Sequence, residues 1–474
     1  MIIIQNILAE AISYGKQLGA KFVELRSQAI ERTSINLLEG KGKTIHGLDG
    51  GTAIRVLTDG AWGFVSIAST ELDILKNGVK NAYSLAKVAG THSQEPIILF
   101  PADPLEDTFK LQIKEDPREI STAEKKTRLV NLHEILVKTD ERILSSTIDY
   151  ADITGTQYYQ NSDDVQVTMD KCITWARILA NGKDANVRAG GREEIGSHEG
   201  YWIFSENNLS EIAKKLSKRV ITTLEAKPGK GGKFPAILGP SVAGVLAHEA
   251  CGHLFEADLT ESGVIKTVLG KRIGSDLATI VDDGTHPEGI GTFPYDDEGT
   301  PAQRTVILDQ GRVNALLTNR EYAQKLMPIT AELEDKVECS PSGNARAFDF
   351  RVPPLIRMRN TYFEPGDLTW EELLEPIKFG YYFDNIRGGE ASLEGTFTVG
   401  VQEAYEIVNG EVGQPVRGVS VTGNTLETLM GISGLGKANS FRLAPGRCGK
   451  GQTAFTGDGG SNLRVDEITV AGEN

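Results

Sequence analysis

Residues 237–258 read ILGPSVAGVLAHEACGHLFEAD, and they contain two of the seven histidines of the chain. These two are His248 and His253, and Glu249 directly follows the first. A neutral imidazole is a good ligand for zinc, and a carboxylate beside it can take a proton from a water that the metal activates. In the helical pattern H-E-x-x-H the histidines are four residues apart and project from one face. In this stretch they are five residues apart.

A spacing of five requires a distorted helix if both histidines are to bind one ion. Position i+5 lies roughly 140° around a regular helix from position i. A π-bulge would widen the turn, and such bulges tend to occur at functional sites. Pro240 suits the first turn of a helix, and Gly252 tolerates a distortion or a break. We therefore predict that His248 and Glu249 lie on a helix and that His253 lies at its distorted end.

Cys251 is a second candidate partner for His248. It lies three residues later, on the same face of an undistorted helix, and thiolate binds zinc well. By spacing alone, His248 with Cys251 fits a metal as well as His248 with His253. The alternative to any metal site is that the two histidines flank a buried glycine turn and that Cys251 is a small core residue.

The string His248-Glu249-Ala250-Cys251-Gly252-His253, followed by Glu256-Ala257-Asp258, resembles the signature of the TldD subunit of the TldD/PmbA (TldE) family of zinc metallopeptidases. In that family both histidines of H-E-x-x-x-H bind zinc, the adjoining glutamate is the base, and a cysteine near the C-terminus completes the site. The resemblance therefore implies Glu249 as the base and three zinc ligands, His248, His253 and Cys448. Cys448 opens the string Cys448-Gly449-Lys450-Gly451-Gln452. The resemblance spans nearly the whole chain, and the PmbA subunit lacks the histidine motif.

Glu256 and Asp258 are better candidates for supporting the ligands than for binding the metal. A carboxylate often accepts the second N–H of a ligating imidazole and so fixes its tautomer. Glu256 lies three residues after His253 and can do this, although capping the distorted helix end is an equally good role. Three protein ligands and one open position are typical of catalytic zinc, whereas a structural site would need a fourth ligand such as Cys251 or Glu256.

The composition is typical of a globular protein with more than one domain. The chain has 474 residues, which exceeds one ordinary core, so two or three domains are expected. Hydrophobic residues make up 39% and charged residues 24%, unlike a disordered protein. The formal net charge of -15 argues against a general nucleic-acid binder, because such proteins carry a basic surface.

The cysteines and the N-terminal residues predict a cytoplasmic protein. The start MIIIQN lacks a basic segment and is soon followed by Glu10, which is unlike a signal peptide. No run approaches the roughly 20 apolar residues of a membrane span. The four cysteines lie far apart and form no C-x-x-C pair, so no disulfide framework is expected. They are Cys172, Cys251, Cys339 and Cys448.

The hydrophobic pattern predicts an α+β fold with an N-terminal region of two helix-sheet-helix units. The first unit covers residues 1–90, and residues 91–118 form a connector rich in Pro and Asp. Residues 119–226 repeat the helix-sheet-helix order as a second unit. Residues 227–474 form a β-rich C-terminal metallopeptidase domain that carries the metal-binding helix. The main boundary is placed at the Gly- and Lys-rich stretch 227–233, which reads as a linker.

The sequence predicts three turns in the C-terminal half. Asn409-Gly410 separates two alternating segments and predicts a tight hairpin. Residues 282–285 and 296–300 are acidic, but neither has the register of a calcium-binding loop with its terminal glutamate. We interpret them as acidic turns, and the second also matches the family pattern. His286, which follows the first, is a weak spare ligand candidate.

The resemblance implies a peptidase that works with a partner. Its substrates would be short or unfolded peptides, or peptides that undergo maturation, reached through a narrow channel in a heterodimer with a PmbA/TldE-type subunit; a homodimer is the alternative assembly. A second hypothesis is a regulatory binding protein, because the family has also been labelled a modulator of DNA gyrase. Such a role would not need Glu249, and the negative charge disfavours direct contact with DNA. A third hypothesis is a scaffold with a structural zinc.

Overall fold

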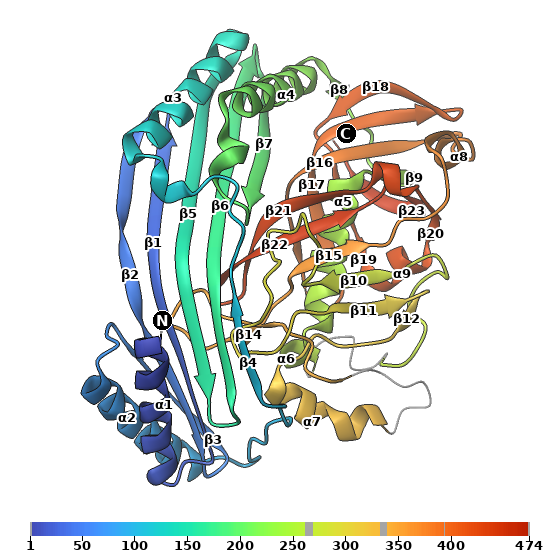
Figure 1. The fold of residues 1–474 in the computed structure, drawn as a ribbon. Coiled ribbons are helices and arrows are strands. Elements are labelled where there is room, and N and C mark those ends of the chain that lie inside the picture. The colour runs from blue at the N-terminus through green and yellow to red at the C-terminus, as the bar shows by residue number, and fades with distance from the viewer. Residues whose placement is uncertain (1, 261–268, 332–338, 393, 473–474) are drawn as a thin grey trace.

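The structure, a computed structural model, describes residues 2–260, 269–331, 339–392 and 394–472. The N-terminal half forms one sheet of long strands with helices on its outer face, and the β-rich C-terminal half lies against the other face (Figure 1). This arrangement confirms the predicted α+β fold with a β-rich C-terminal part.

The elements of the N-terminal half are α1 (Ile2–Gln17), β1 (Phe22–Leu38), β2 (Lys41–Thr58), β3 (Ala61–Ile67), α2 (Leu72–Gly90), β4 (Leu105–Phe109), α3 (Thr122–Thr139), β5 (Ile143–Asn161), β6 (Val165–Asp184), β7 (Val187–Ser197) and α4 (Glu206–Glu225). The sheet order is β3-β2-β1-β5-β6-β4, and β7 pairs with β6. The two predicted helix-sheet-helix units therefore share one sheet, because β1 of the first pairs with β5 of the second from Glu24–Asn161 to Leu38–Thr147. The expected connector contributes β4, which pairs in parallel with β6.

Side-chain alternation along β1 assigns each face of the sheet. Val23 and Leu25 pack with α1 and α2, and Ile35 and Leu37 pack with α3 and α4. Ile30 points to the opposite face and packs against the C-terminal half. Because successive side chains of a strand alternate between faces, all four helices cover one side and leave the other for the C-terminal half.

The elements of the C-terminal half are β8 (Lys227–Pro228), β9 (Gly232–Leu238), α5 (Pro240–Val245), a π-helical turn (Leu246–Cys251), a 3-10 turn (Gly252–Phe255), α6 (Ala257–Thr260), β10 (Ile280–Asp283), β11 (Arg304–Asp309), β12 (Arg312–Val313), α7 (Arg320–Ala331), β13 (Ala345–Arg346), β14 (Leu355–Ile356), β15 (Asn360–Phe363), α8 (Trp370–Leu374), β16 (Phe379–Ala391), β17 (Thr396–Val408), β18 (Glu411–Arg417), β19 (Ser420–Asn424), α9 (Thr425–Met430), β20 (Ile432–Leu435), β21 (Arg442–Gly449), β22 (Thr453–Gly460) and β23 (Leu463–Ala471). The expected linker is partly paired, because β8 lies beside β18. Asn409 and Gly410 have φ of 50° and 79° in the turn between β17 and β18, which confirms the predicted hairpin.

Two sheets enclose α5. One has the order β16-β9-β23-β19-β17-β18-β8, with β20 paired to β23, and the other has the order β12-β11-β10-β15-β22-β21. Helix α5 contacts β9, β16 and β17 of the first sheet and β15, β21 and β22 of the second. The helix begins at Pro240, as predicted, because a first-turn residue needs no hydrogen-bond donor. The two sheets therefore fix the direction in which the following π-helical turn points.

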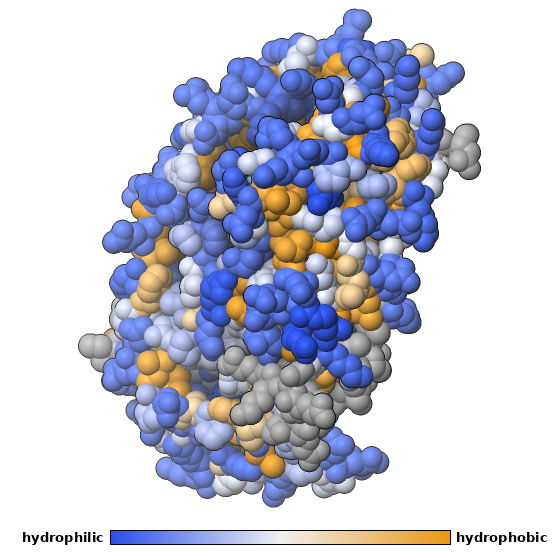
Figure 2. Space-filling model, turned by 90° about the vertical axis from the view of Figure 1, so that its right-hand side faces the viewer, coloured by the Kyte–Doolittle hydropathy of each residue, from blue (hydrophilic) through white to orange (hydrophobic). Residues whose placement is uncertain are grey.

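The face of the C-terminal half that looks away from the long sheet is mainly hydrophilic, with scattered hydrophobic patches (Figure 2). Among the helices of the described ranges, none has the length and apolar character that crossing a membrane requires.

Buried charges join the long sheet to the C-terminal half. Arg55 on β2 donates a hydrogen bond to Glu298 of the C-terminal half at 2.7 Å and another to Glu24 on β1. Glu24 also accepts a hydrogen bond from the hydroxyl of Tyr159 at 2.7 Å. All four side chains are buried. Arg55 is therefore the cation that both of these buried carboxylates contact.

We predict that Arg55→Met lowers the free energy of unfolding by about 3–5 kcal/mol, because it leaves two buried carboxylates without their cation. The shift of the urea denaturation curve measures this. The control is Lys138→Met, which breaks an exposed pair with Glu134 and should cost less than about 1 kcal/mol. A loss below about 1 kcal/mol in Arg55→Met would contradict the interpretation of this contact.

Candidate metal centre

The widened turn that the five-residue spacing requires is present. Residues Leu246–Cys251 form a π-helical turn directly after α5, and Gly252–Phe255 continue as a 3-10 turn. The rings of His248 and His253 consequently approach each other, with centroids 5.1 Å apart and planes at 90°. The predicted placement of His248 on a helix and His253 at its distorted end is confirmed.

Gly252 is required for close packing and not for an unusual backbone angle. Its φ and ψ of -53° and -47° are ordinary helical values, and the distortion lies at Cys251, with φ of -121°. A Cβ atom at position 252 would lie 2.0 Å from Sδ of Met358. The helix changes from a π-helical to a 3-10 turn at Gly252, where a distortion or break was expected, and close packing against Met358 is what excludes a side chain here.

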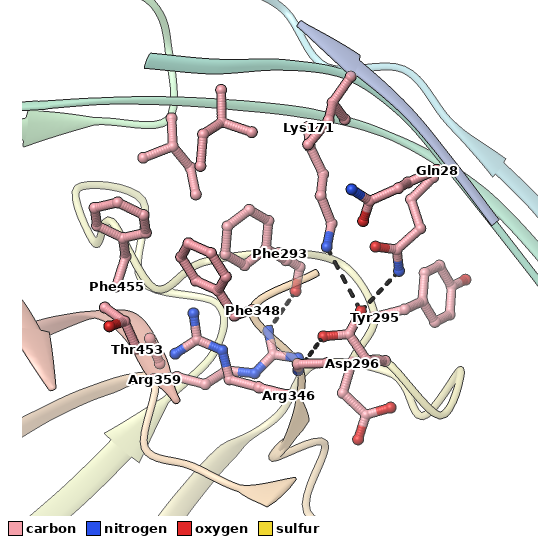
Figure 3. A pocket seen from close by; sticks show the side chains of 17 residues that line it. Gln28, Lys171, Phe293, Tyr295, Asp296, Arg346, Phe348, Arg359, Thr453 and Phe455 are labelled. Carbon is pink, nitrogen blue, oxygen red and sulfur yellow. Dashed lines mark hydrogen bonds and ion pairs between the residues drawn. The ribbon is translucent and has the colours of Figure 1, made fainter. Parts of the chain in front are cut away.

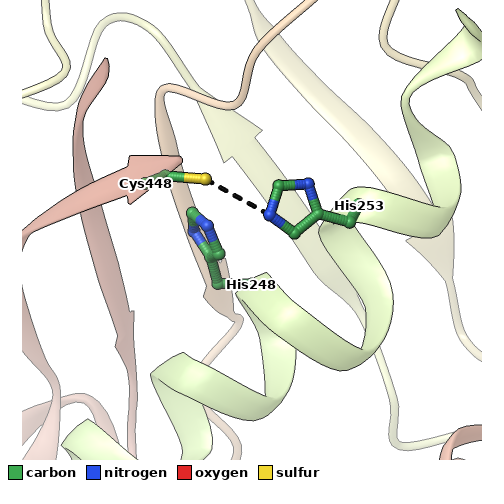
Figure 4. A group of neighbouring side chains, drawn as sticks. All are labelled: His248, His253 and Cys448. Carbon is green, nitrogen blue, oxygen red and sulfur yellow. Dashed lines mark hydrogen bonds between the residues drawn. The ribbon is translucent and has the colours of Figure 1, made fainter. Parts of the chain in front are cut away.

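Cys448 reaches the two histidines from β21 (Figure 4). Its Sγ lies 3.2 Å from Nε2 of His253, and one ligand atom from each of the three residues fits within a group no more than 4.8 Å across. Burial raises the pKa of the Cys448 thiol, but the charges and hydrogen bonds of His248 and His253 outweigh this effect and lower it to about 5. The sulfur is therefore a thiolate at neutral pH, which is the form that binds metals.

A carboxylate contacts Nδ1 of each histidine. Glu256 Oε2 lies 2.9 Å from Nδ1 of His253, and Asp458 Oδ1 lies 2.7 Å from Nδ1 of His248. A carboxylate at Nδ1 favours a proton on that nitrogen, so Nε2 is the atom that can bind an ion once its own proton is lost. The contact between Glu256 and Nδ1 of His253 is the one expected if Glu256 fixes the tautomer of that ring.

Asp458 is a residue of the site that sequence reasoning did not predict. It lies on β22, 210 residues after His248, and neither its spacing nor its neighbours mark it. The acidic character of a residue in a glycine-rich strand (Thr-Gly-Asp-Gly-Gly) was the one available signal. Only the pairing of β22 beside α5 brings this carboxylate to the ring.

Lys450 neutralises the carboxylates on the His253 side. Its Nζ donates to Glu256 Oε2 at 3.1 Å and to Asp258 Oδ1 at 2.6 Å. Asp258 thus contacts the lysine, which in turn contacts Glu256. Burial favours the neutral form of Glu256, but its contacts with His253, Lys450 and Arg357 outweigh this and lower its pKa. The buried carboxylate is therefore held ionised.

Glu249 lies beside the group of donor atoms. Its Oε2 is 3.9 Å from Nε2 of His253, and the side chain is half-buried. Burial raises the pKa of Glu249, although the two histidines oppose this effect. A carboxylate with a raised pKa is a stronger base than an exposed one.

Two further ligand candidates lie elsewhere. Cys251 is buried in the hydrophobic core, which raises its pKa, and it is not in the donor group found among the described residues. The ring of His286 lies edge-to-face with Tyr362 and at a tilt to Phe441. The acidic turn at 296–300 binds protein groups: Asp297 contacts Arg26 and Lys171.

The donor set fits a zinc ion. One thiolate and two imidazoles are ligands that zinc prefers, and three protein donors leave a fourth position for a water or a substrate. Each imidazole also has the carboxylate partner that zinc-bound histidines usually have.

Comparison with known proteins identifies one family along most of the chain. Residues 23–86 match the model of PmbA/TldA metallopeptidase domain 1, residues 115–224 match the central domain, and residues 231–472 match the C-terminal domain. A metalloprotease of Methanocaldococcus jannaschii is 34% identical over 451 residues, which cover 94% of this chain and 96% of the relative. A zinc metalloprotease TldD homolog of Saccharolobus solfataricus is 32% identical over 467 residues, which cover 97% and 99%.

Solved structures share the fold at low identity. TldE from Thermococcus kodakarensis matches with a TM-score of 0.77 at 17% identity, over 98% of this chain and 100% of that chain. A Thermotoga maritima protein, described as a proposed modulator of a DNA gyrase, matches with a TM-score of 0.77 at 22% identity, over 98% and 99%.

We predict that Cys448→Ser lowers zinc affinity more than the roughly 10–100-fold typical of losing a hydrogen-bonded partner of a ligand. The reason is that a neutral hydroxyl replaces a thiolate that is already ionised at neutral pH. Metal analysis after dialysis against a competing chelator measures this. Cys339→Ser, a buried cysteine outside the site, is the control. Full zinc occupancy without the Cys448 thiol would overturn its assignment as a ligand.

We predict that Asp458→Ala weakens zinc binding by about 10–100-fold, because the ring of His248 loses the group that fixes its orientation and tautomer. Titration against a zinc-sensitive dye gives the affinity. Asp466→Ala removes an exposed carboxylate on the neighbouring strand β23 and should leave the affinity unchanged. Equal affinities in the two variants would show that Asp458 does not support the ligand.

Proposed function

The chain belongs to the PmbA/TldD metallopeptidase family, and on this premise we propose that it is a zinc-dependent peptidase. The observation that carries the proposal is the group of three donor atoms from His248, His253 and Cys448 within 4.8 Å, with Glu249 beside it. When bound there, zinc would supply Lewis-acid chemistry, polarising a peptide carbonyl and making a water easier to deprotonate.

The remaining chemistry belongs to residues of the chain. Glu249 accepts the proton of the attacking water and then donates it to the leaving amine. Its raised pKa suits both transfers, because the carboxylate must bind a proton and release it within one turnover. Asp458 and Glu256 hold the two imidazoles in the orientation and tautomer that ligation requires.

Strand β21, which also contacts β7 of the long sheet, is the element along which we propose that an extended peptide binds near this centre. That strand carries Cys448, and it is at one end of the order β12-β11-β10-β15-β22-β21, so one side of it is unpaired within that sheet. Strand addition to a sheet edge is a common way to bind an unfolded peptide without reading its sequence. This supports short or unfolded peptides as substrates. As part of the same proposal, their cleavage serves degradation or maturation and takes place in the cytoplasm.

A PmbA/TldE-type subunit is the partner that we propose. This chain shares its fold with TldE along almost its entire length. This likeness supports a heterodimer of two similar subunits. A homodimer is the alternative assembly.

Two other functions compete with the peptidase. A non-catalytic regulatory protein of the gyrase-modulator type would need neither Glu249 nor an open metal position. A scaffold with a structural zinc would need a fourth protein ligand, and the donor group in the described part of the chain contains three.

We predict that Glu249→Gln lowers kcat for peptide cleavage by at least about 1000-fold while zinc stays bound, because the amide cannot accept the proton. Cleavage of a quenched fluorescent peptide by the zinc-loaded protein, with the proposed partner added, gives the rate. Glu467→Gln, an exposed change on β23, should keep full activity. Unchanged cleavage and an unchanged cellular phenotype in Glu249→Gln would favour the regulatory hypothesis.

A further inference from the structure

A cavity of about 60 Å3 lies between the inner face of the long sheet and the C-terminal half (Figure 3). This volume holds a few water molecules or one carboxylate group. Apolar side chains from both halves form its walls: Ile30, Ile153 and Ile173 from the sheet, and Phe293, Phe348 and Phe455 from the C-terminal half. Phe348 is 39% exposed, so the cavity reaches the surface at this ring.

The charged residues of the cavity have an excess of cations. Lys171, Arg346 and Arg359 line it, against two acids, Asp296 and Asp297. Burial above all, together with repulsion from Glu298, raises the pKa of Asp296 to about 7, which reduces its negative charge at neutral pH. Burial also lowers the pKa of Lys171, although Asp297 opposes this effect. The lining of the cavity thus has three basic side chains against two acidic ones.

Asp297 and Arg359 are already committed to protein partners. Asp297 accepts hydrogen bonds from the backbone of Ala347 at 2.7 Å and from Gln157 at 2.8 Å, and it lies 3.5 Å from Lys171. Arg359 donates to the carbonyl oxygen of Phe293 at 2.6 Å and to that of Gly343 at 2.7 Å. Asp297 is therefore not available to balance the charge of the third cation, and Arg359 adds a positive charge of its own.

Arg346 is that third cation. Within the described ranges it donates one hydrogen bond, from its guanidinium to the carbonyl oxygen of Met358 at 2.6 Å, and it has no carboxylate at ion-pair distance. Burial, together with repulsion from Arg359 and Arg357, lowers its pKa to about 9. A half-buried guanidinium with free donors beside a cavity is a site for a planar anion, because its fork matches a carboxylate.

Two contacts connect the walls of the cavity to the metal centre. Ala454 lines it, and Ala454 is the register partner of Cys448 in the β21–β22 pair. Met358, whose carbonyl holds Arg346, packs against Gly252 between the two histidines of the centre. Both contacts join the walls of the cavity to residues of the metal centre, so the two sites lie close together in the fold.

We propose that this cavity binds a carboxylate group of the peptide substrate, with Arg346 as the group that pairs with it and the three phenylalanine rings packing around it. The inference rests on the proposed peptidase function and assigns it a substrate class: peptides with a carboxylate a few residues from the cleaved bond. The carboxylate has two sources, the C-terminus of the peptide or an acidic side chain.

Three sets of peptides test the proposal. The first is an acetylated pentapeptide of alanine and phenylalanine with a free C-terminus. The second is the same peptide with a C-terminal amide. The third is a series of the amide peptide in which glutamate is placed at successive positions. For the zinc-loaded wild type we expect kcat/KM at least about tenfold higher for a carboxylate peptide than for the neutral amide. The first and third sets distinguish a terminal carboxylate from a side chain.

Arg346→Gln should bring this ratio close to one, because the cavity loses the cation that pairs with the carboxylate. Arg346→Lys should keep part of the preference, because the charge remains but the fork is lost. Lys138→Gln makes the same change of charge on the exposed face of α3 and should behave as wild type. A wild type without preference, or a preference that survives in Arg346→Gln, would overturn the proposal.

A second variant covers the case in which Arg346→Gln does not fold. Phe348→Glu puts a carboxylate in the wall of the cavity, at the side chain that Arg32 covers at 4.9 Å. A negative charge there should repel an entering carboxylate and reduce the preference for carboxylate peptides. An unchanged preference in folded Phe348→Glu protein contradicts the proposal.

Binding of the same peptides to Glu249→Gln protein separates this proposal from the peptidase itself. Calorimetry needs no turnover, and we expect the carboxylate peptide to bind about tenfold more tightly than the amide, with the difference lost in Glu249→Gln/Arg346→Gln. If the wild type cleaves none of the peptides but this difference is present, the peptidase function fails and the carboxylate site stands. Equal affinities for both peptides reject the carboxylate site whatever the enzyme cleaves.

Discussion

The spacing of five residues between His248 and His253 is the constraint on which the rest of the structure depends. A regular helix would point the two rings apart, and the π-helical turn Leu246–Cys251 brings them to one side. Such a turn is less favourable than an α-helical one, so the surroundings must hold it. The two sheets around α5 do so, and Met358 fills the space above Gly252 so closely that position 252 admits no side chain.

Charged side chains around the three donor atoms contact one another and the two imidazole rings. Each imidazole is placed between a carboxylate at Nδ1 and the thiolate side of the group, so each ring has a fixed orientation. Lys450, two residues after Cys448, neutralises Glu256 and Asp258. The same short segment therefore supplies the sulfur and the cation that stabilises the buried carboxylates, which links the strand β21 to the helix that it faces.

Polar residues on the inner face of the long sheet connect the two halves of the molecule. Arg26 and Arg55 point away from the helices and contact Asp297 and Glu298 of the acidic turn. Buried ionic contacts of this kind depend on orientation more than apolar contacts do, because a misplaced partner leaves an uncompensated charge. They therefore set the position of the sheet over the C-terminal half, and the cavity at Arg346 lies in this same interface.

The sequence alone determined the local features. The hydrophobic period located the helices, Asn409-Gly410 located a hairpin, Pro240 marked the start of α5, and the histidine spacing required the widened turn. The α+β class followed from these periods, and the family followed from the motif strings. Each of these depends on residues within about one turn or one strand of each other, where geometry is set by backbone chemistry.

Only the tertiary structure decided which distant residues meet. The alternation of apolar and polar residues along a strand does not show that β1 pairs with β5. The structure shows this pairing, and it joins the two predicted units in one sheet. The proximity of Cys448 was implied by resemblance, but nothing in the sequence indicated Asp458, the close packing of Met358 on Gly252, or the excess of cations at Arg346. Those contacts join residues that are up to 210 positions apart, and their geometry depends on the register of strands and the packing of sheets, which a single sequence does not encode in any local pattern.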